Sequence, residues 1–493
     1  MNRSLSLLFL LCGAGAMRAN DVSGISYFNV RPVQSHPMQQ NLLVDQATDT
    51  GRVLRMKGIQ ATAFFGQSTA AEELGKYFGI GGKSEMTVKE TEIAADGPTG
   101  ELTQDILSLN FNLNTNAGGF HSTIKFRPQQ TFGGVGLSAR MHFRDCYWLM
   151  VEAPIVHVKN NMHLTETIIN NGGGVTGGAG LNNFTSATTM KDAFKQAGML
   201  YGKIDGAQTA TGLADLTIKF GYDNPFLNRK DLFMNMFVGV VLPTGNKPKA
   251  VYMFEPIYGN GGHAAFMMGS HGEVDLGKFK QGKLWLSWNA HTQYLFENTQ
   301  KRSFDLKHNG PWSRYLSMFE TQAKRTAAGV TNATWGINLL TQDAKVTPGY
   351  SGTFDTMISY MGSKYYGGAG YSTFVRQAEK VELAKAWQYT ESCITAYDQA
   401  GDDINRFRTI GTTFIDLEEN DLATLLPIGE IDINLNSAAH PSSVSHMVHA
   451  NFGYHNQARS YPFIVESGAS YEFSRQNTAM SRWAVWANVR ISF

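Results

Sequence analysis

Ionisable side chains recur on one parity in several segments of this 493-residue chain. Alternate residues of a β-strand point to the same face, so this spacing gathers the charges on one side of each strand. Two kinds of chemistry are open to such rows. Segregated charges of opposite sign can line a water-filled channel and set its ion preference, or they can pair and hold a wall together. The candidate pore-lining residues are Arg140, His142, Arg144, Asp215, Lys219, Glu466, Glu472, Arg482 and Arg490.

The other parity of these segments is apolar, as in Trp483, Val485, Ala487, Val489, Ile491 and Phe493 of the last one. An apolar outer face and a wet inner face are what a transmembrane β-barrel requires. A charge facing lipid at mid-depth would cost about 2–4 kcal/mol. A soluble β-sandwich also alternates, with its polar residues outward. Strands of about ten residues, aromatic strand ends that could form interfacial girdles and the final phenylalanine favour the barrel. The girdle candidates are Tyr222, Tyr454, Tyr471, Phe473, Trp483 and Phe493.

Both ends of the chain agree with export to a bacterial outer membrane. A C-terminal strand that ends in phenylalanine resembles the assembly signal of outer-membrane barrels, here carried by Trp483, Val489, Ile491 and Phe493. Residues 1–19 have a positive start, a short apolar core and then small residues, which predicts a cleaved secretory signal peptide. No later segment has the uninterrupted apolar length of a membrane helix. The expected partners are outer-membrane lipid, the barrel-assembly machinery and small-molecule solutes.

The alternation predicts an all-β fold: a transmembrane antiparallel β-barrel of about 14 strands, within a range of 12 to 16, over residues 59–493. Residues 20–58 are expected to form a periplasmic tail or a segment that enters the lumen. Long loops are expected at 159–211, 298–332 and 376–428, with short helices at 189–201 and 378–399. Such loops are usually extracellular, and any of them could instead fold inward and constrict the pore. The expected strands lie near 59–66, 107–113, 119–127, 135–144, 147–158, 214–222, 232–242, 284–296, 333–341, 353–361, 364–375, 429–436, 448–454, 463–473 and 482–493.

Composition excludes some functions and leaves others open. A net charge of +1 argues against nucleic acid as the main partner. Cys146 and Cys393 could pair in an oxidising periplasm, which sequence does not decide. Neither a metal-binding cysteine and histidine spacing nor a Gly-x-Ser-x-Gly or His-Glu-x-x-His motif occurs, so no cofactor or enzyme activity is expected. The densest histidine group is His440, His446, His449 and His455, with His446 on the opposite parity from the last two.

Residues 212–245 read GLADLTIKFGYDNPFLNRKDLFMNMFVGVVLPTG: Gly-x-x-Asp-Leu, a strand, a short polar turn, a second strand and Leu-Pro-Thr-Gly. This pattern, continued to residue 296, resembles the outer-membrane transporter-like family associated with the meta-pathway of phenol degradation, which is similar in architecture to long-chain fatty-acid transporters. The resemblance implies passive uptake of small compounds, hydrophobic ones included. Residues 1–100 and 376–428 do not share it.

Two functions follow from these patterns. The first is a porin-like outer-membrane channel for passive diffusion of small solutes, selected by pore width, lumen charge and loop constriction. The second is a non-transporting surface barrel, an adhesin or structural protein whose long loops bind partners. A barrel hydrolase is a more distant third. The sequence decides neither the solute nor the oligomeric state.

Overall fold

The computed structural model describes residues 21–36, 57–90, 104–113, 119–143, 146–172, 185–223, 231–321, 323–324, 332–394, 409–411, 427–456 and 462–493. The predicted signal peptide, residues 1–19, lies outside these ranges, and so does Arg144.

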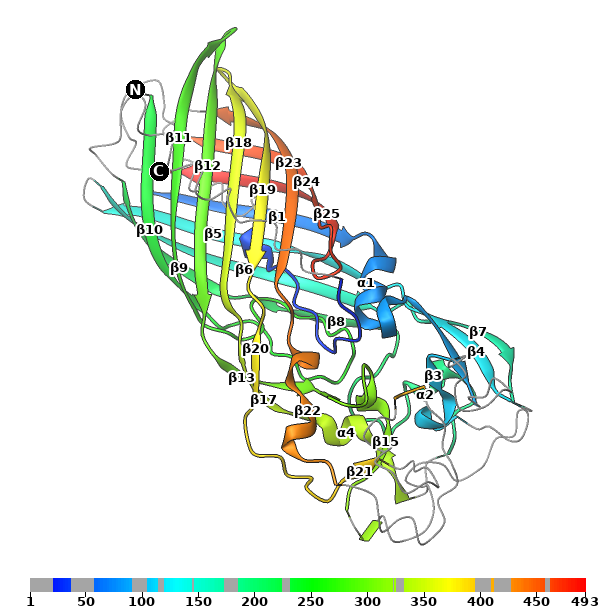
Figure 1. Cartoon of the computed structure of the whole chain (residues 1–493). Helices are drawn as coiled ribbons and strands as arrows, with labels where there is room; N and C mark the ends of the chain where they lie inside the picture. Colours follow the sequence, from blue (N-terminus) through cyan, green and yellow to red (C-terminus); the bar gives the residue numbers. More distant parts are fainter. Residues whose placement is uncertain are drawn as a thin grey trace, which may run out of the picture.

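The dominant element is a closed antiparallel β-barrel (Figure 1). Thirteen strands form one sheet, and pairing of β5 with β6 closes twelve of them into a ring that leaves β8 (Ala207–Leu213) outside. β6 pairs with β9 along its first half and with β8 along its second half. The wall strands are β1 (Gly58–Ser68), β5 (Gln129–Phe143), β6 (Tyr147–Asn161), β9 (Leu216–Asp223), β10 (Leu232–Leu242), β11 (Ala265–Phe279), β12 (Gly282–Leu295), β18 (Gly349–Met361), β19 (Tyr365–Arg376), β23 (Ser443–Asn456), β24 (Phe463–Phe473) and β25 (Arg482–Ser492).

The connections between wall strands are short at one end of the barrel and long at the other. Two residues join β11 to β12 and three join β18 to β19, at the end where β25 finishes the chain. The long connections gather at the opposite end, where they form a folded region that we call the mouth (Figure 1).

The mouth has its own hydrophobic core, which includes the buried rings of Tyr77, Phe78, Trp312 and Trp335. Its helices are α1 (Ala71–Phe78), α2 (Met190–Ala193) and α4 (Gly336–Leu340). Its strands are β2 (Glu85–Lys89), β3 (Ile106–Leu107), β4 (His121–Lys125), β7 (Thr165–Asn170), β13 (Asn298–Ser303), β14 (Asp305–Leu306), β15 (Ser317–Phe319), β16 (Thr334–Trp335), β17 (Thr341–Thr347), β20 (Lys380–Leu383), β21 (Cys393–Ile394) and β22 (Ile433–Asn434).

The estimate of about 14 wall strands is therefore two too high, although twelve lies within the predicted range. Four expected wall strands belong to the mouth: 107–113 is mainly a 3-10 turn, 119–127 is β4, 333–341 is β16 followed by α4, and 429–436 is a 3-10 turn and β22. Their apolar residues point into the mouth core, and sequence alternation does not distinguish a core-facing row from a lipid-facing one. The helix expected at 378–399 is also wrong, because the described part of that stretch, residues 378–394, contains β20 and β21 and no helix.

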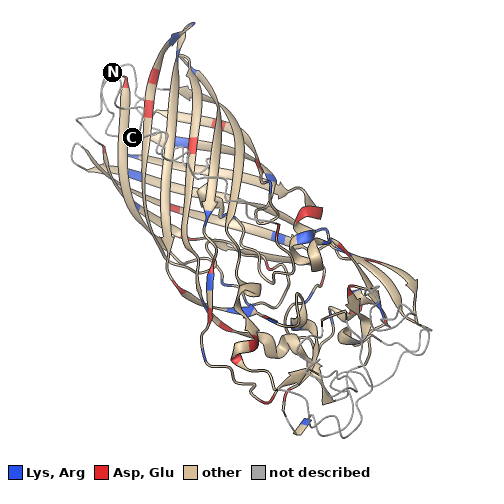
Figure 2. Ribbon diagram, in the orientation of Figure 1, with Lys and Arg blue, Asp and Glu red and all other residues tan. Residues whose placement is uncertain are grey.

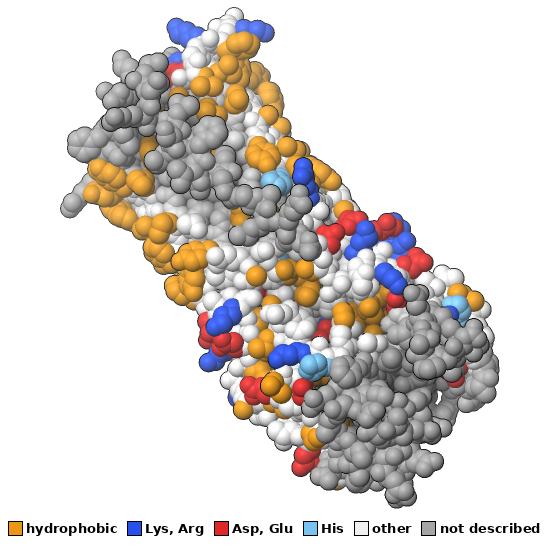
Figure 3. Space-filling model, in the orientation of Figure 1, with side chains coloured by type: hydrophobic (Ala, Val, Ile, Leu, Met, Phe, Trp, Pro, Cys, Tyr) orange, Lys and Arg blue, Asp and Glu red, His pale blue; other side chains and the backbone are white. Residues whose placement is uncertain are grey.

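Exposed apolar side chains cover the outside of the wall, whereas charged side chains collect over the mouth (Figure 3). Aromatic contacts form on this outer face near both rims. Phe143, Tyr147 and Phe220 stack near the short turns, while Phe65 packs against Trp483 near the mouth. No helix among the described residues is both long and apolar enough to cross a membrane.

Candidate functional site: the barrel lumen

The wall strands turn six of the candidate pore-lining residues inward, where each is buried: Arg140, Lys219, Glu466, Glu472, Arg482 and Arg490. His142 lies on the same parity of β5 as Arg140. Asp215 lies between β8 and β9 and is not on a wall strand. Its carboxylate accepts the backbone N–H groups of Gly245 at 3.0 Å and Asn260 at 2.5 Å, and so holds the connection between β10 and β11.

Among the described residues, opposite charges in the lumen form mixed pairs and not separate rows of one sign. Positions of both signs are interspersed along the wall strands (Figure 2). Lys219 Nζ lies 2.8 Å from Glu152 Oε2. Arg482 Nε lies 2.7 Å from Glu472 Oε2. Each pair joins different strands, so the pairs tie the wall together as well as neutralise it.

Asp223 at the end of β9 contacts two side chains of β5. Arg140 Nη2 lies 3.6 Å from Asp223 Oδ1, and His142 Nε2 lies 3.1 Å from Asp223 Oδ2. Asp223 and Glu152 were not among the sequence candidates. Both follow the inward parity of their strands, so their parity is the signal that could have identified them.

Residues 21–36, which we call the lumen segment, begin in the mouth core, where Phe28 is buried, and end against the inner wall near the mouth. Arg31 Nη1 lies 3.2 Å from Glu472 Oε1, and Arg482 Nη2 donates to the Arg31 carbonyl at 3.0 Å. The ring of His36 also hydrogen-bonds Arg482. Further along, the Asn29 amide donates to Glu379 of the mouth at 3.1 Å. Chain separate from the wall therefore occupies this part of the lumen.

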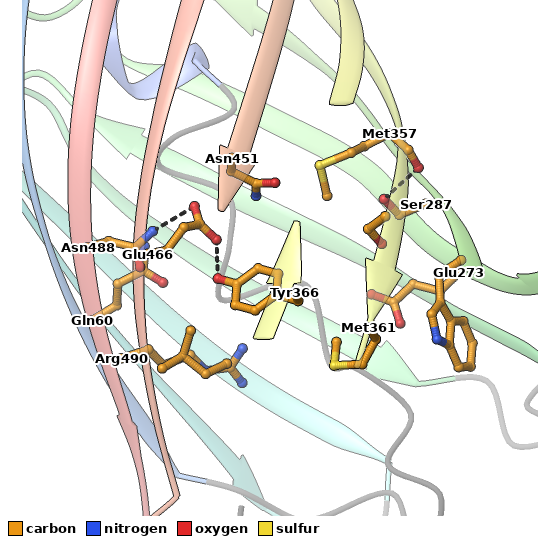
Figure 4. A pocket seen from close by; sticks show the side chains of 13 residues that line it. Gln60, Glu273, Ser287, Met357, Met361, Tyr366, Asn451, Glu466, Asn488 and Arg490 are labelled. Atoms are coloured by element: carbon orange, nitrogen blue, oxygen red, sulfur yellow. Dashed lines mark hydrogen bonds between the residues drawn. The ribbon is translucent and has the colours of Figure 1, made fainter. Parts of the chain in front are cut away.

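The lumen near the short turns contains a polar pocket (Figure 4). Glu466 accepts hydrogen bonds from the Tyr366 hydroxyl, from Trp486 Nε1 at 3.3 Å and from Asn488 Nδ2 at 3.2 Å. Arg490 also lines this pocket. The pocket has a cavity volume of about 30 Å³, which is room for two or three water molecules.

The histidines of β23 do not share a site. His449 points inward and lies 2.8 Å from Asp355 Oδ2. His446 points outward, where the Tyr371 hydroxyl lies 2.6 Å from its Nδ1. His440 lies in the mouth core between Phe28 and Tyr77. The described residues contain no group of three or more side chains placed to hold a metal ion.

The residues of the expected assembly signal lie on the outer face of β25. Val489 and Phe493 are exposed there, and Ile491 lies between them on the same face. Cys146 and Cys393 are both free thiols. The first lies at the short-turn end and the second in a strand of the mouth, so they do not pair.

Comparison with solved structures finds the following similarities. An outer membrane channel from Pseudomonas putida F1 has 10% identity, coverage of 90% of this chain and 98% of that chain, and a TM-score of 0.36. A FadL homologue from Pseudomonas aeruginosa has 9% identity, coverage of 95% and 98%, and a TM-score of 0.27. The Pseudomonas putida toluene transporter TodX has 8% identity, coverage of 95% and 96%, and a TM-score of 0.31. Neither a protein-family profile nor a curated protein matches the chain. Similarities this low do not assign a function to the chain.

Proposed function

We propose that this protein is a bacterial outer-membrane channel through which small solutes diffuse passively, and that the structure is its closed state. Residues 1–19 direct export, the short turns face the periplasm and the mouth faces the cell exterior. The wall spans the bilayer because its ring of strands leaves no unpaired edge and its outer face is apolar.

One observation carries the proposal: the lumen near the mouth is filled by the lumen segment. A barrel that serves only as a scaffold can fill its interior with side chains of its own wall. Here a separate stretch of chain occupies the lumen, and Arg31 holds it to Glu472 and Arg482 of the wall. A held segment can leave the lumen without dismantling the wall, so the contacts of Arg31 are where opening would begin.

Conductance of the purified full chain in planar lipid bilayers tests this function. We expect stepwise openings, and we expect Arg31→Ala to raise the open fraction several-fold because it removes the ion pair with Glu472. Lys76→Ala is the matched control, since Lys76 is an exposed cation on α1 that pairs with Glu73 away from the lumen. Silence of all three proteins across many preparations would refute the channel. Equal open fractions in wild type and Arg31→Ala would refute the role of Arg31.

The class of solute is tested separately, by uptake into proteoliposomes. The resemblance of residues 212–296 favours small hydrophobic compounds, whereas the polar pocket around Glu466 favours solutes that form hydrogen bonds. Parallel uptake of a small aromatic hydrocarbon and of a small polyol, each measured against protein-free vesicles, distinguishes the two.

A second function is favoured by the mouth, whose hydrophobic core is separate from the two clusters within the barrel. Such a folded surface region suits an adhesin or another surface-binding protein. Cells that lack the protein would then lose attachment to a host or matrix surface while their solute uptake stays unchanged. Lost uptake with unchanged attachment would support the channel instead.

A further inference from the structure

Three of the lumen cations lie against an aromatic ring that rests over a glycine of the neighbouring strand. Each cation also meets a carboxylate. We call these arrangements the wall units and name them by their glycines, Gly66, Gly221 and Gly269.

The Gly221 unit shows the geometry most fully. Gly221 and Trp148 are direct partners across β9 and β6, and a Cβ at position 221 would lie 2.0 Å from the indole ring. Only glycine therefore lets the ring lie over this strand. The guanidinium carbon of Arg140 lies 4.4 Å from a Trp148 ring centroid. Asp223 accepts the indole N–H at 3.0 Å and lies 3.6 Å from Arg140.

The Gly66 unit has the same arrangement of glycine, ring, cation and carboxylate on other strands. Gly66 of β1 pairs with Phe132 of β5, and a Cβ at position 66 would lie 2.5 Å from the phenyl ring. The guanidinium carbon of Arg482 lies 5.1 Å from the centroid of that ring. Glu472 then pairs with Arg482 at 2.7 Å.

The Gly269 unit is the third. Gly269 of β11 pairs with Phe237 of β10, and a Cβ at position 269 would lie 2.5 Å from the ring. Lys219 Nζ lies 5.5 Å from the centroid of Phe237 and 2.8 Å from Glu152. In all three units an aromatic ring lies along the wall and a cation lies against the face of that ring. A carboxylate then neutralises the cation.

We propose that Gly66, Gly221 and Gly269 are positioning residues that set the free width and the charge balance of the lumen. Without a Cβ, each glycine lets a ring lie along the wall, and the ring and carboxylate keep the cation away from the lumen axis. The charges therefore stay paired at the wall, and the channel discriminates weakly between cations and anions and passes uncharged solutes. This inference rests on the proposed channel function.

Gly221→Ala in planar bilayers under a potassium chloride gradient tests the inference. The added methyl group displaces Trp148 and carries Arg140 toward the lumen axis while Asp223 stays on its strand. We expect the open-channel conductance to fall to about half, and the reversal potential to shift toward anion preference. The full chain is used throughout.

Gly272→Ala is the matched control, because a tryptophan ring also lies over Gly272, but on the outer face of the wall. A Cβ at position 272 would lie 2.0 Å from Trp288, and the two are direct partners across β11 and β12. This variant should lose stability while it keeps wild-type conductance and reversal potential. A folded Gly221→Ala channel with wild-type values for both would overturn the inference, since a merely structural glycine would behave in that way.

Two further measurements keep the inference testable if a variant does not fold or if the wild type does not conduct. If Gly221→Ala does not fold, Trp148→Leu removes the ring that holds Arg140 and should shift the reversal potential in the same direction, whereas an unchanged potential would overturn the inference. If even the wild type never conducts, the proposed function fails. In that case the crystal structure of Gly221→Ala tests the positioning role, because an undisplaced ring would refute it. If only Gly66→Ala folds, the structure of that variant serves instead.

Discussion

Lys57 and Phe493 exchange two backbone hydrogen bonds across the seam of the barrel. The Lys57 N–H donates to the Phe493 carbonyl at 3.2 Å, and the Phe493 N–H donates to the Lys57 carbonyl at 2.9 Å. The register continues from Gly58 opposite Ser492 to Ser68 opposite Arg482. The pairing of β1 with β25 therefore extends one residue beyond the end of each strand.

Deletion of Phe493 should impair assembly, because it removes both of these bonds and an exposed aromatic side chain at the rim. Unpaired backbone groups within a bilayer cost several kcal/mol each. We expect a several-fold smaller fraction of the protein to migrate as a folded, SDS-resistant barrel before boiling. Val485→Ala trims another outward side chain of β25 while keeping every backbone hydrogen bond of the seam, and a loss as large in that variant would contradict this explanation.

Lys219→Ala should destabilise the barrel by about 3–5 kcal/mol, because it leaves the carboxylate of Glu152 buried without its partner. The double variant with Lys219→Met and Glu152→Gln removes both charges and should recover most of that loss. Urea unfolding in detergent micelles measures the difference. No recovery in the double variant would show that packing, and not the ion pair, determines the effect.

Phe28→Ala should loosen the mouth while leaving the wall intact. The Phe28 ring contacts Tyr77 at 4.9 Å and Phe254 at 6.3 Å between centroids, and removal of a buried phenylalanine side chain costs about 3–5 kcal/mol. Limited proteolysis should cut the mouth faster, whereas the SDS-resistant band should persist. Proteolysis at the wild-type rate would show that the lumen segment contributes little to the mouth core.

Acid should destabilise the mouth through His440. Burial, followed by the nearby charge of Arg376, lowers the pKa of His440 to about 3. The unfolded chain binds a proton near pH 6.5 and the folded mouth does not, so this contribution is fully present above pH 6.5 and is lost as the pH falls toward 3. Between pH 6.5 and pH 5 the loss is about 2 kcal/mol.

His440→Phe should remove most of this acid sensitivity, because the phenyl ring can occupy the site between Phe28 and Tyr77 without titrating. The measurement is the rate of proteolysis of the mouth as a function of pH in the two proteins. Parallel pH profiles would assign the acid sensitivity to other groups.

Eleven of the twelve wall strands could be predicted from the alternation of their residues, because a strand with lipid on one side and polar lumen on the other has a strict period of two. β11 was missed because its outward row passes through Ser270 and Gly272, which interrupt the apolar pattern. Trp288 of the next strand covers that glycine and supplies the missing apolar surface. Because this tryptophan belongs to the neighbouring strand, the sequence of β11 alone does not show the apolar surface.

The inward parity of Arg140, Lys219, Glu472 and Arg482 could likewise be read from sequence, but their partners could not. Parity states which face a residue occupies, while the partner depends on the stagger between neighbouring strands. Arg31 shows the limit most clearly, because it lies 441 residues from Glu472 in the chain and belongs to a segment without alternation.

The lumen segment connects the two ends of the chain, since the Val22 N–H donates to the Asn477 side chain across 455 residues. The ring encircles Arg31, so the N-terminal stretch must either wait inside while the final hairpins insert or be threaded through a finished cylinder. Contacts this remote in sequence form late and slowly. The contacts of Arg31 with Glu472 and Arg482 therefore form only once β24 and β25 are in place.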